Sequence, residues 1–213
     1  MYGLPYHKET DFEVVQEFIQ RFPLAFLNGV SSNNIPVATQ VPLFLEERND
    51  KLILLGHLMK NTDHHKAFVS NSHVLAVFTG PNSYVSGSWY ENPHTPSTWN
   101  YISVHLQGEI RFLEGDDLIE VLRMTSLHFE NNDASSPTAY DNIPKDLTDR
   151  LKNAIVAFEI EVRDIDTVFK LSQDRDQESY RNIIRELKKG DSSAQFIARE
   201  MEKRIDEMKP RWE

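Results

Sequence analysis

Apolar and polar side chains alternate most regularly over residues 99–113. Apolar residues such as Ile102, Val104 and Leu106 stand at even positions, and polar residues such as His105 stand at odd positions. A period of two predicts a β-strand with one buried face. The other face is expected to meet water or a ligand.

Shorter runs of the same character predict further strands, most of them joined by tight turns. The predicted ranges are 24–30, 35–45, 51–58, 74–79 and 156–162. Pro36 and Pro42 lack amide donors, so the second of these strands is expected at a sheet edge or with a bulge. After Gly80 an irregular stretch is expected as far as Thr98.

Apolar residues at helical spacing predict helices that lie between these strands and fill the tail. They cover residues 12–22, 63–70 and 116–130, a segment that begins at Pro144, and two tail segments, 180–187 and 192–208. The connections are too short for repeated right-handed crossovers between parallel strands. The pattern therefore predicts an α+β protein with an antiparallel barrel or sandwich, peripheral helices and a helical C-terminal tail.

Composition narrows the functional classes. The 213 residues suffice for one large domain or two small ones, and the chain contains no cysteine. Disulfides, thiol catalysis and cysteine-based metal sites are therefore excluded, and a cytoplasmic location is expected. The net charge of −10 opposes direct binding to DNA or to an anionic membrane. The longest apolar runs are far shorter than the roughly 20 residues of a membrane helix.

The segment from Gly56 to Lys66 is the first candidate binding site. It runs from a predicted strand end into a predicted helix start, where free backbone amides favour an anion. The side chains that could add charge or donors are His57, Lys60, His64, His65 and Lys66. A solvated turn with surface lysines is the alternative. A metal site is not favoured, because the histidine spacing differs from that of zinc ligands.

Two further segments carry candidate chemistry. Aromatic and hydroxyl side chains gather over residues 83–90 and 98–101, which suits a planar ligand such as a flavin or a nucleobase. The alternative is a loop that packs over the barrel end or lies in a dimer interface. Residues 170–175 precede a predicted helix and are interpreted as an N-cap with mixed charges. Motifs for dinucleotide or triphosphate binding are absent.

Several of these segments together resemble the PaiB-like family of FMN-binding negative transcriptional regulators. The matching segments are Met1-Tyr2, residues 36–43, Gly56-His57, residues 77–86, residues 88–90, residues 98–101, Val104-His105, Gly108 and residues 170–173. The resemblance implies a split β-barrel, which is predicted over residues 1–168. A helical extension is predicted over residues 169–213, packed on the barrel or on a dimer partner, and its second helix, from about residue 192, lies beyond the matching segments. It also implies a homodimer with FMN sites at the interface of the two barrels.

The resemblance further implies roles for individual residues. Lys60, Asn61 and Lys66 would hold the FMN phosphate, with His57 nearby. Residues at the ring system would be Thr39 and Gln40, with Trp99, Asn100 and Tyr101 reaching from the same chain or from the partner. The chain departs from the family at Gln40 and Gln107, where histidine is usual, and at residues 62–64, where the family has Pro-x-Trp.

The sequence therefore predicts an FMN-binding homodimer with a regulatory or sensing role and no direct contact with DNA. Whether it is an enzyme stays open. One alternative is a flavin-dependent oxidoreductase or flavin reductase, since the flavin would carry the redox chemistry. A second alternative is a flavin-free dimeric interaction module, which the departures at Gln40 and residues 62–64 suggest.

Overall fold

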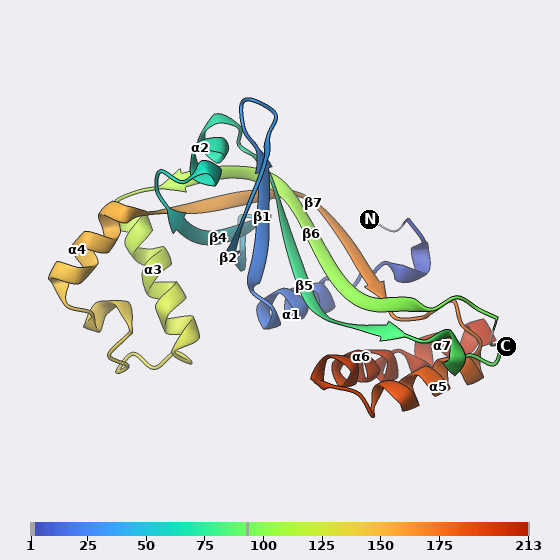
Figure 1. The fold of residues 1–213 in the computed structure, drawn as a ribbon. Helices are drawn as coiled ribbons and strands as arrows, with labels where there is room; N and C mark the ends of the chain where they lie inside the picture. Colours follow the sequence, from blue (N-terminus) through green and yellow to red (C-terminus); the bar gives the residue numbers. More distant parts are fainter. Residues whose placement is uncertain (1–2, 93, 213) are drawn as a thin grey trace. The chain divides into compact units, whose positions relative to one another are not determined.

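A computed structural model describes residues 3–92 and 94–212, without the side chains of residues 209–211. Met1 and Tyr2, which open the family resemblance, lie outside the described residues. The strands are β1 (Leu24–Val30), β2 (Pro36–Pro42), β3 (Phe44–Arg48), β4 (Lys51–Met59), β5 (His73–Val85), β6 (Thr98–Leu113) and β7 (Ile155–Lys170) (Figure 1). The helices are η1 (Pro5–His7), α1 (Phe12–Arg21), α2 (Asp63–Ser70), η2 (Gly87–Trp89), α3 (Asp116–Phe129), η3 (Tyr140–Asn142), α4 (Lys145–Ala154), α5 (Gln177–Leu187), α6 (Ser192–Lys203) and α7 (Ile205–Trp212).

The strands form one seven-stranded sheet in the order β2-β1-β5-β6-β7-β4-β3. β1 pairs antiparallel with β2 and β5, and β4 pairs antiparallel with β3 and β7. β2 lies at one edge of this order, as its two prolines predict. The α+β class with an antiparallel sheet is therefore confirmed.

Contacts within the chain divide it into two compact units. Unit 1 contains Met1–Phe18, Thr79–Val104 and Asp166–Glu213, and unit 2 contains Ile19–Phe78 and His105–Ile165. The strands β5, β6 and β7 contribute residues to both. The C-terminal helices thus share a unit with the N-terminal segment, while the predicted domain boundary at residue 168 stays a prediction.

Two strands extend beyond their predicted ends, and one predicted strand is divided. β5 continues through Pro81 to Val85, and β7 continues to Lys170. Proline removes only one amide donor, so a strand tolerates it where no partner needs that donor. The predicted strand 35–45 breaks at Leu43, whose N–H instead donates to the carbonyl oxygen of Pro23 at 2.9 Å.

The tail forms three helices rather than the two that the sequence predicts. The side chains of Asp176 and Asp191 accept backbone hydrogen bonds and cap α5 and α6. α6 ends at Lys203, and α7 follows after Arg204. The Arg204 side chain is buried and pairs with Glu9 at 2.8 Å, which ties the helix junction to the N-terminal segment of unit 1.

Within the part of the chain that the structure describes, no helix is both long enough and apolar enough to cross a membrane.

Candidate functional site

The turn between β4 and α2 positions the side chains that the sequence predicts at a phosphate. Lys60 N donates to the carbonyl oxygen of Ala154 at 2.9 Å, which fixes the end of β4. Asn61 follows with a φ of 65°, in the left-handed region that asparagine adopts more readily than most residues. Thr62 then caps α2. The local sequence Asn-Thr-Asp thus builds a sharp turn into a helix.

Positive charge gathers at this turn. Burial lowers the pKa of His65, and the nearby charges of His64, Lys60 and Lys66 lower it further. Among the described residues, neither Lys60 nor Lys66 forms an ion pair with a carboxylate. Both lysines act on His65, so both charges would stabilise an anion bound close to this residue. No three potential metal ligands lie together in the same described residues.

The helix amides at this turn are already occupied, which the sequence does not predict. Asp63 Oδ1 accepts the hydrogen bond from His64 N at 2.8 Å, and Thr62 Oγ1 accepts the one from His65 N at 3.3 Å. Lys66 N donates to the carbonyl oxygen of Thr62 at 3.1 Å. The expectation of free amides is therefore wrong for His64 N and His65 N, whereas the bond of Lys66 N is the ordinary first bond of the helix. The lysine side chains and the exposed Asn61 remain as groups that suit a phosphate.

His57 supplies a buried polar atom without a partner. It lies on β4, opposite Ala157 of β7, and is half-buried. Its Nδ1 has no hydrogen-bond partner among the described residues, and burial lowers the pKa of its ring. Buried polar atoms normally find a partner in the protein, in water or in a ligand. The Nδ1 of His57 is thus a polar group on β4, the strand that leads into the turn, for which the described residues supply no partner.

The other predicted residues of unit 2 lie on elements that pack together. α2 packs against β1 and β2, and β2 contacts β4. A Cβ added to Gly29 of β1 would stand 2.7 Å from the Phe68 ring, so this glycine permits the close approach of α2. Thr39 is half-buried on β2, and Gln40 is exposed opposite Phe26 of β1.

The remaining three predicted residues lie in unit 1, at the start of β6. Trp99 is exposed and meets the Tyr84 ring edge to face at 5.9 Å between centroids. Tyr101 is half-buried. Asn100, in contrast, is fully buried, and its carboxamide is used within unit 1. It accepts a hydrogen bond from Ser172 Oγ at 3.0 Å and donates to the sulfur of Met201 at 3.5 Å.

The expectation that residues 170–175 cap the following helix is wrong, because the N-cap of α5 is Asp176. Ser172 and Gln173 are both buried. The Gln173 side chain accepts a hydrogen bond from Leu171 N at 2.8 Å and contacts His7 Nδ1 at 3.0 Å. The segment therefore fixes the core of unit 1. Residues 170–173 are among the segments that match the family, and this match could have indicated their structural role from the sequence.

Two solved structures are similar to this chain in fold. The flavocytochrome Anf3 from Azotobacter vinelandii superposes with a TM-score of 0.56 at 15% identity, over 79% of this chain and 72% of that one. The FAD- and haem-binding protein from Mycobacterium smegmatis superposes with a TM-score of 0.51 at 16% identity, over 77% and 73%. The expected split-barrel fold with peripheral helices is confirmed.

Sequence comparison goes further than fold. The chain is 33% identical over 207 residues to the protease synthase and sporulation protein PAI 2 of Bacillus subtilis, which covers 96% of this chain and 98% of that protein. This confirms the PaiB-like resemblance. A family model for flavin binding matches residues 1–164, and FMN is the cofactor named for that family. The chain therefore belongs to the family described as "Putative FMN-binding domain".

Proposed function

We propose that this protein is a homodimer that binds FMN through the β4–α2 turn and has a regulatory or sensing role. The observation that carries the proposal is that Lys60 and Lys66, which form no ion pair among the described residues, both act on His65 at this turn. Membership of the flavin-binding family supports the choice of ligand. When bound, FMN would supply one-electron or hydride transfer chemistry.

The protein groups would act on separate parts of the ligand. Lys60 and Lys66 would hold the phosphate by charge, and the exposed Asn61 would add a hydrogen bond. Thr39 and Gln40, on the strand that contacts β4, would border the ring system. Trp99 and Tyr101 stay candidates for ring contacts, whereas Asn100 acts through the packing of unit 1 because its carboxamide is buried and paired.

An exposed apolar face on β1 supports the homodimer. Leu24, Phe26 and Val30 point outward and are 53%, 42% and 36% exposed. They lie opposite Pro42, Gln40 and Pro36 of β2, so the outer face of this hairpin carries few charges. A face of this kind on an edge hairpin is stabilised when a second copy covers it.

Phe26→Glu should convert the dimer into a monomer, because the new carboxylate would be buried without a partner at the interface. Gel filtration with light scattering measures the mass. Leu147→Glu is the matched control, since Leu147 on α4 is 43% exposed and should tolerate the charge. An unchanged dimer in the Phe26 variant would exclude this face as the interface.

FMN binding is tested by absorbance and fluorescence titration of the purified protein. Lys66→Glu should weaken FMN affinity at least about tenfold, because it places a negative charge where the phosphate would bind. Lys145→Glu makes the same charge change at another exposed lysine and should leave affinity unchanged. Equal affinity in wild type and the Lys66 variant would refute the assignment of the phosphate.

A flavin-free interaction module is the second candidate. The observation in its favour is the occupied set of helix amides, with the Asp63 carboxylate at the same turn. A dimer that shows no spectral change on addition of FMN would support this alternative.

The regulatory part of the proposal is supported by the relative in Bacillus subtilis, whose name associates it with protease synthesis and sporulation. The net charge of −10 argues that such regulation would act through a ligand or a protein partner rather than by direct contact with DNA. A mobility-shift assay at low salt tests this, and a specific shift with the purified protein alone would overturn it.

A further inference from the structure

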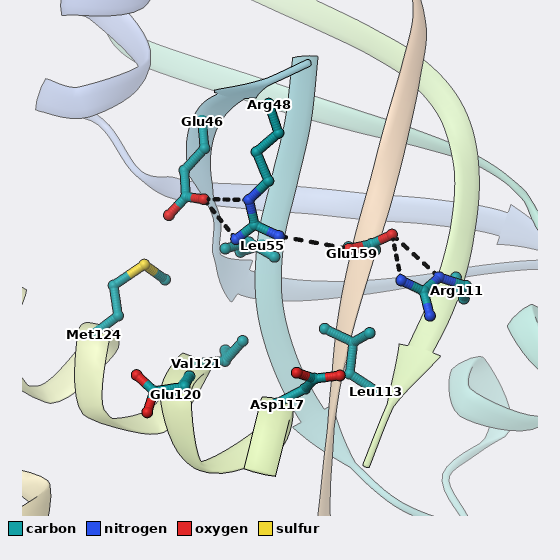
Figure 2. A pocket seen from close by; sticks show the side chains of 10 residues that line it. All are labelled: Glu46, Arg48, Leu55, Arg111, Leu113, Asp117, Glu120, Val121, Met124 and Glu159. Atoms are coloured by element: carbon teal, nitrogen blue, oxygen red, sulfur yellow. Dashed lines mark hydrogen bonds and ion pairs between the residues drawn. The ribbon is translucent and has the colours of Figure 1, made fainter. Parts of the chain in front are cut away.

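A cavity of about 480 Å³ lies in unit 2, between α3 and the strands that it covers. Leu55, Leu113, Val121 and Met124 form its apolar lining (Figure 2). The first three are buried and belong to the core cluster on which α3 rests. Small-molecule sites in proteins typically measure about 300–1,000 Å³ and have a largely apolar lining with a few polar groups. This cavity has the typical volume, and its lining combines the four apolar side chains with six charged ones.

The strand side of the cavity is electrically balanced. Glu159 Oε1 on β7 accepts hydrogen bonds from Arg111 Nε at 3.1 Å and from Arg111 Nη2 at 2.8 Å. Arg48 on β3 pairs with Glu46 at 2.6 Å, and its other terminal nitrogen lies 3.8 Å from Glu159. Figure 2 shows these four side chains as one continuous row. Two arginines and two glutamates cancel each other, so this side has no net charge.

The helix side is acidic. Asp117 and Glu120 lie one turn apart on α3, and both line the cavity. Glu120 pairs with Arg123, which also binds Asp141 at 2.7 Å. Asp117 has neither a hydrogen bond nor an ion pair from its side chain within the described residues. The lining carries four carboxylates against two guanidinium groups, and because Glu120 is paired with Arg123, Asp117 is the lining carboxylate without a partner among the described residues.

We propose that this cavity binds a small amphipathic cation, an ammonium group on an alkyl or arylalkyl body. The ammonium would lie against Asp117 and Glu120, and the hydrocarbon body would contact Leu55, Leu113, Val121 and Met124. This assignment uses none of the residues proposed for FMN, so the two sites can be tested separately. The protein would then bind a second ligand in addition to FMN.

Calorimetric titration of the full-length protein with butylammonium, pentylammonium and hexylammonium tests the apolar part. Affinity should rise by about fourfold with each methylene, the factor that burial of one such group confers. Hexanoate has a similar body and the opposite charge, so it should bind more weakly than hexylammonium. Affinity that does not change with chain length, or tighter binding of hexanoate, would overturn the proposal.

The double variant Asp117→Asn/Glu120→Gln tests the acidic part. It should weaken hexylammonium binding by about tenfold, since each exposed ion pair contributes up to about fivefold. Glu114→Gln/Asp116→Asn is the matched control, because it removes the same charge from the same helix start outside this cavity. Equal weakening by both variants would show a general charge effect and contradict the site.

Two further variants test whether the hydrocarbon body contacts the apolar lining and whether the cation binds in this cavity rather than at the proposed FMN site. Met124→Gln should weaken hexylammonium more than ethylammonium, because only the longer body reaches the apolar lining. Lys66→Glu should leave hexylammonium binding unchanged, whatever its effect on FMN. A loss in the Lys66 variant would place the cation at the proposed flavin site and overturn the assignment to this cavity.

Discussion

Two regions of the chain that match the family differ in whether their polar side chains have partners within the protein. In unit 1, Asn100 and Ser172 are buried and bonded to each other, with Met201 as a further partner. In unit 2, Lys60 and Lys66 at the β4–α2 turn form no ion pair with a carboxylate among the described residues, and Nδ1 of His57 on β4 has no partner there. The polar groups of the first region are satisfied by one another, and those of the second are not.

This difference distinguishes motif residues that stabilise the fold from motif residues that are available to bind a ligand. Buried polar groups that bond to one another stabilise one arrangement of the chain. A buried polar group without a partner lowers stability, and such groups normally find a partner in the protein, in water or in a ligand. The sequence pattern and the family resemblance together assigned Asn100 and Lys60 to the same ligand. Burial and hydrogen bonding indicate that Asn100 acts in folding and that Lys60 is available for binding.

Asn100→Leu should give the largest loss of stability. It leaves the hydroxyl of Ser172 buried without its acceptor, which costs about 2 kcal/mol of unfolding free energy. Urea denaturation measures the loss. Gln40→Leu, at an exposed position of β2, should change the free energy by less than about 0.5 kcal/mol.

The same substitution also offers a test by rescue. Asn100→Leu/Ser172→Ala removes both partners, so stability should recover part of the loss. A double variant that is less stable than the sum of both single variants would contradict the paired arrangement in unit 1.

Thr62→Ala should have a smaller effect, in the other region. It removes the side chain that caps α2 and accepts the hydrogen bond from His65 N, which costs about 1 kcal/mol. Urea denaturation at pH 7.5 measures it, and Thr62→Ser should retain most of the stability. An unchanged midpoint in the alanine variant would show that the cap contributes nothing.

The smallest expected effect is a pH dependence. Burial lowers the pKa of His57 and of His65 below the usual value near 6.5. As the pH falls from 7.5 to 5.5, the unfolded chain takes up these protons before the folded chain does, so stability should decrease. Carboxyl groups such as Asp141, whose pKa is lowered beside Arg123, titrate below this window.

His57→Gln should therefore flatten the dependence of unfolding free energy on pH between 7.5 and 5.5. Urea denaturation at several pH values across this window measures the slope. A slope equal to that of the wild type would mean that His57 is not the group that titrates.

Local pattern predicted the elements better than it predicted their ends. The helix at residues 63–70 and the strand at 24–30 have their predicted bounds, because their caps and turns are adjacent in the sequence. The strand that was expected to end at Thr79 continues to Val85, since proline stops a strand only where a partner needs its amide. For the candidate site, the sequence located the lysines but could not show which helix amides were already in use.

The sequence by itself determined the α+β class, the family and the position of the basic turn. It also determined the net negative charge, which opposes direct binding to DNA. These follow from periodicity, composition and short motifs, which depend on neighbouring residues. Only the tertiary structure decided that Asn100 meets Ser172 and that Arg111, Glu159 and α3 enclose a cavity. Such contacts join residues that are tens of positions apart, and their burial depends on how whole elements pack, which no local pattern encodes.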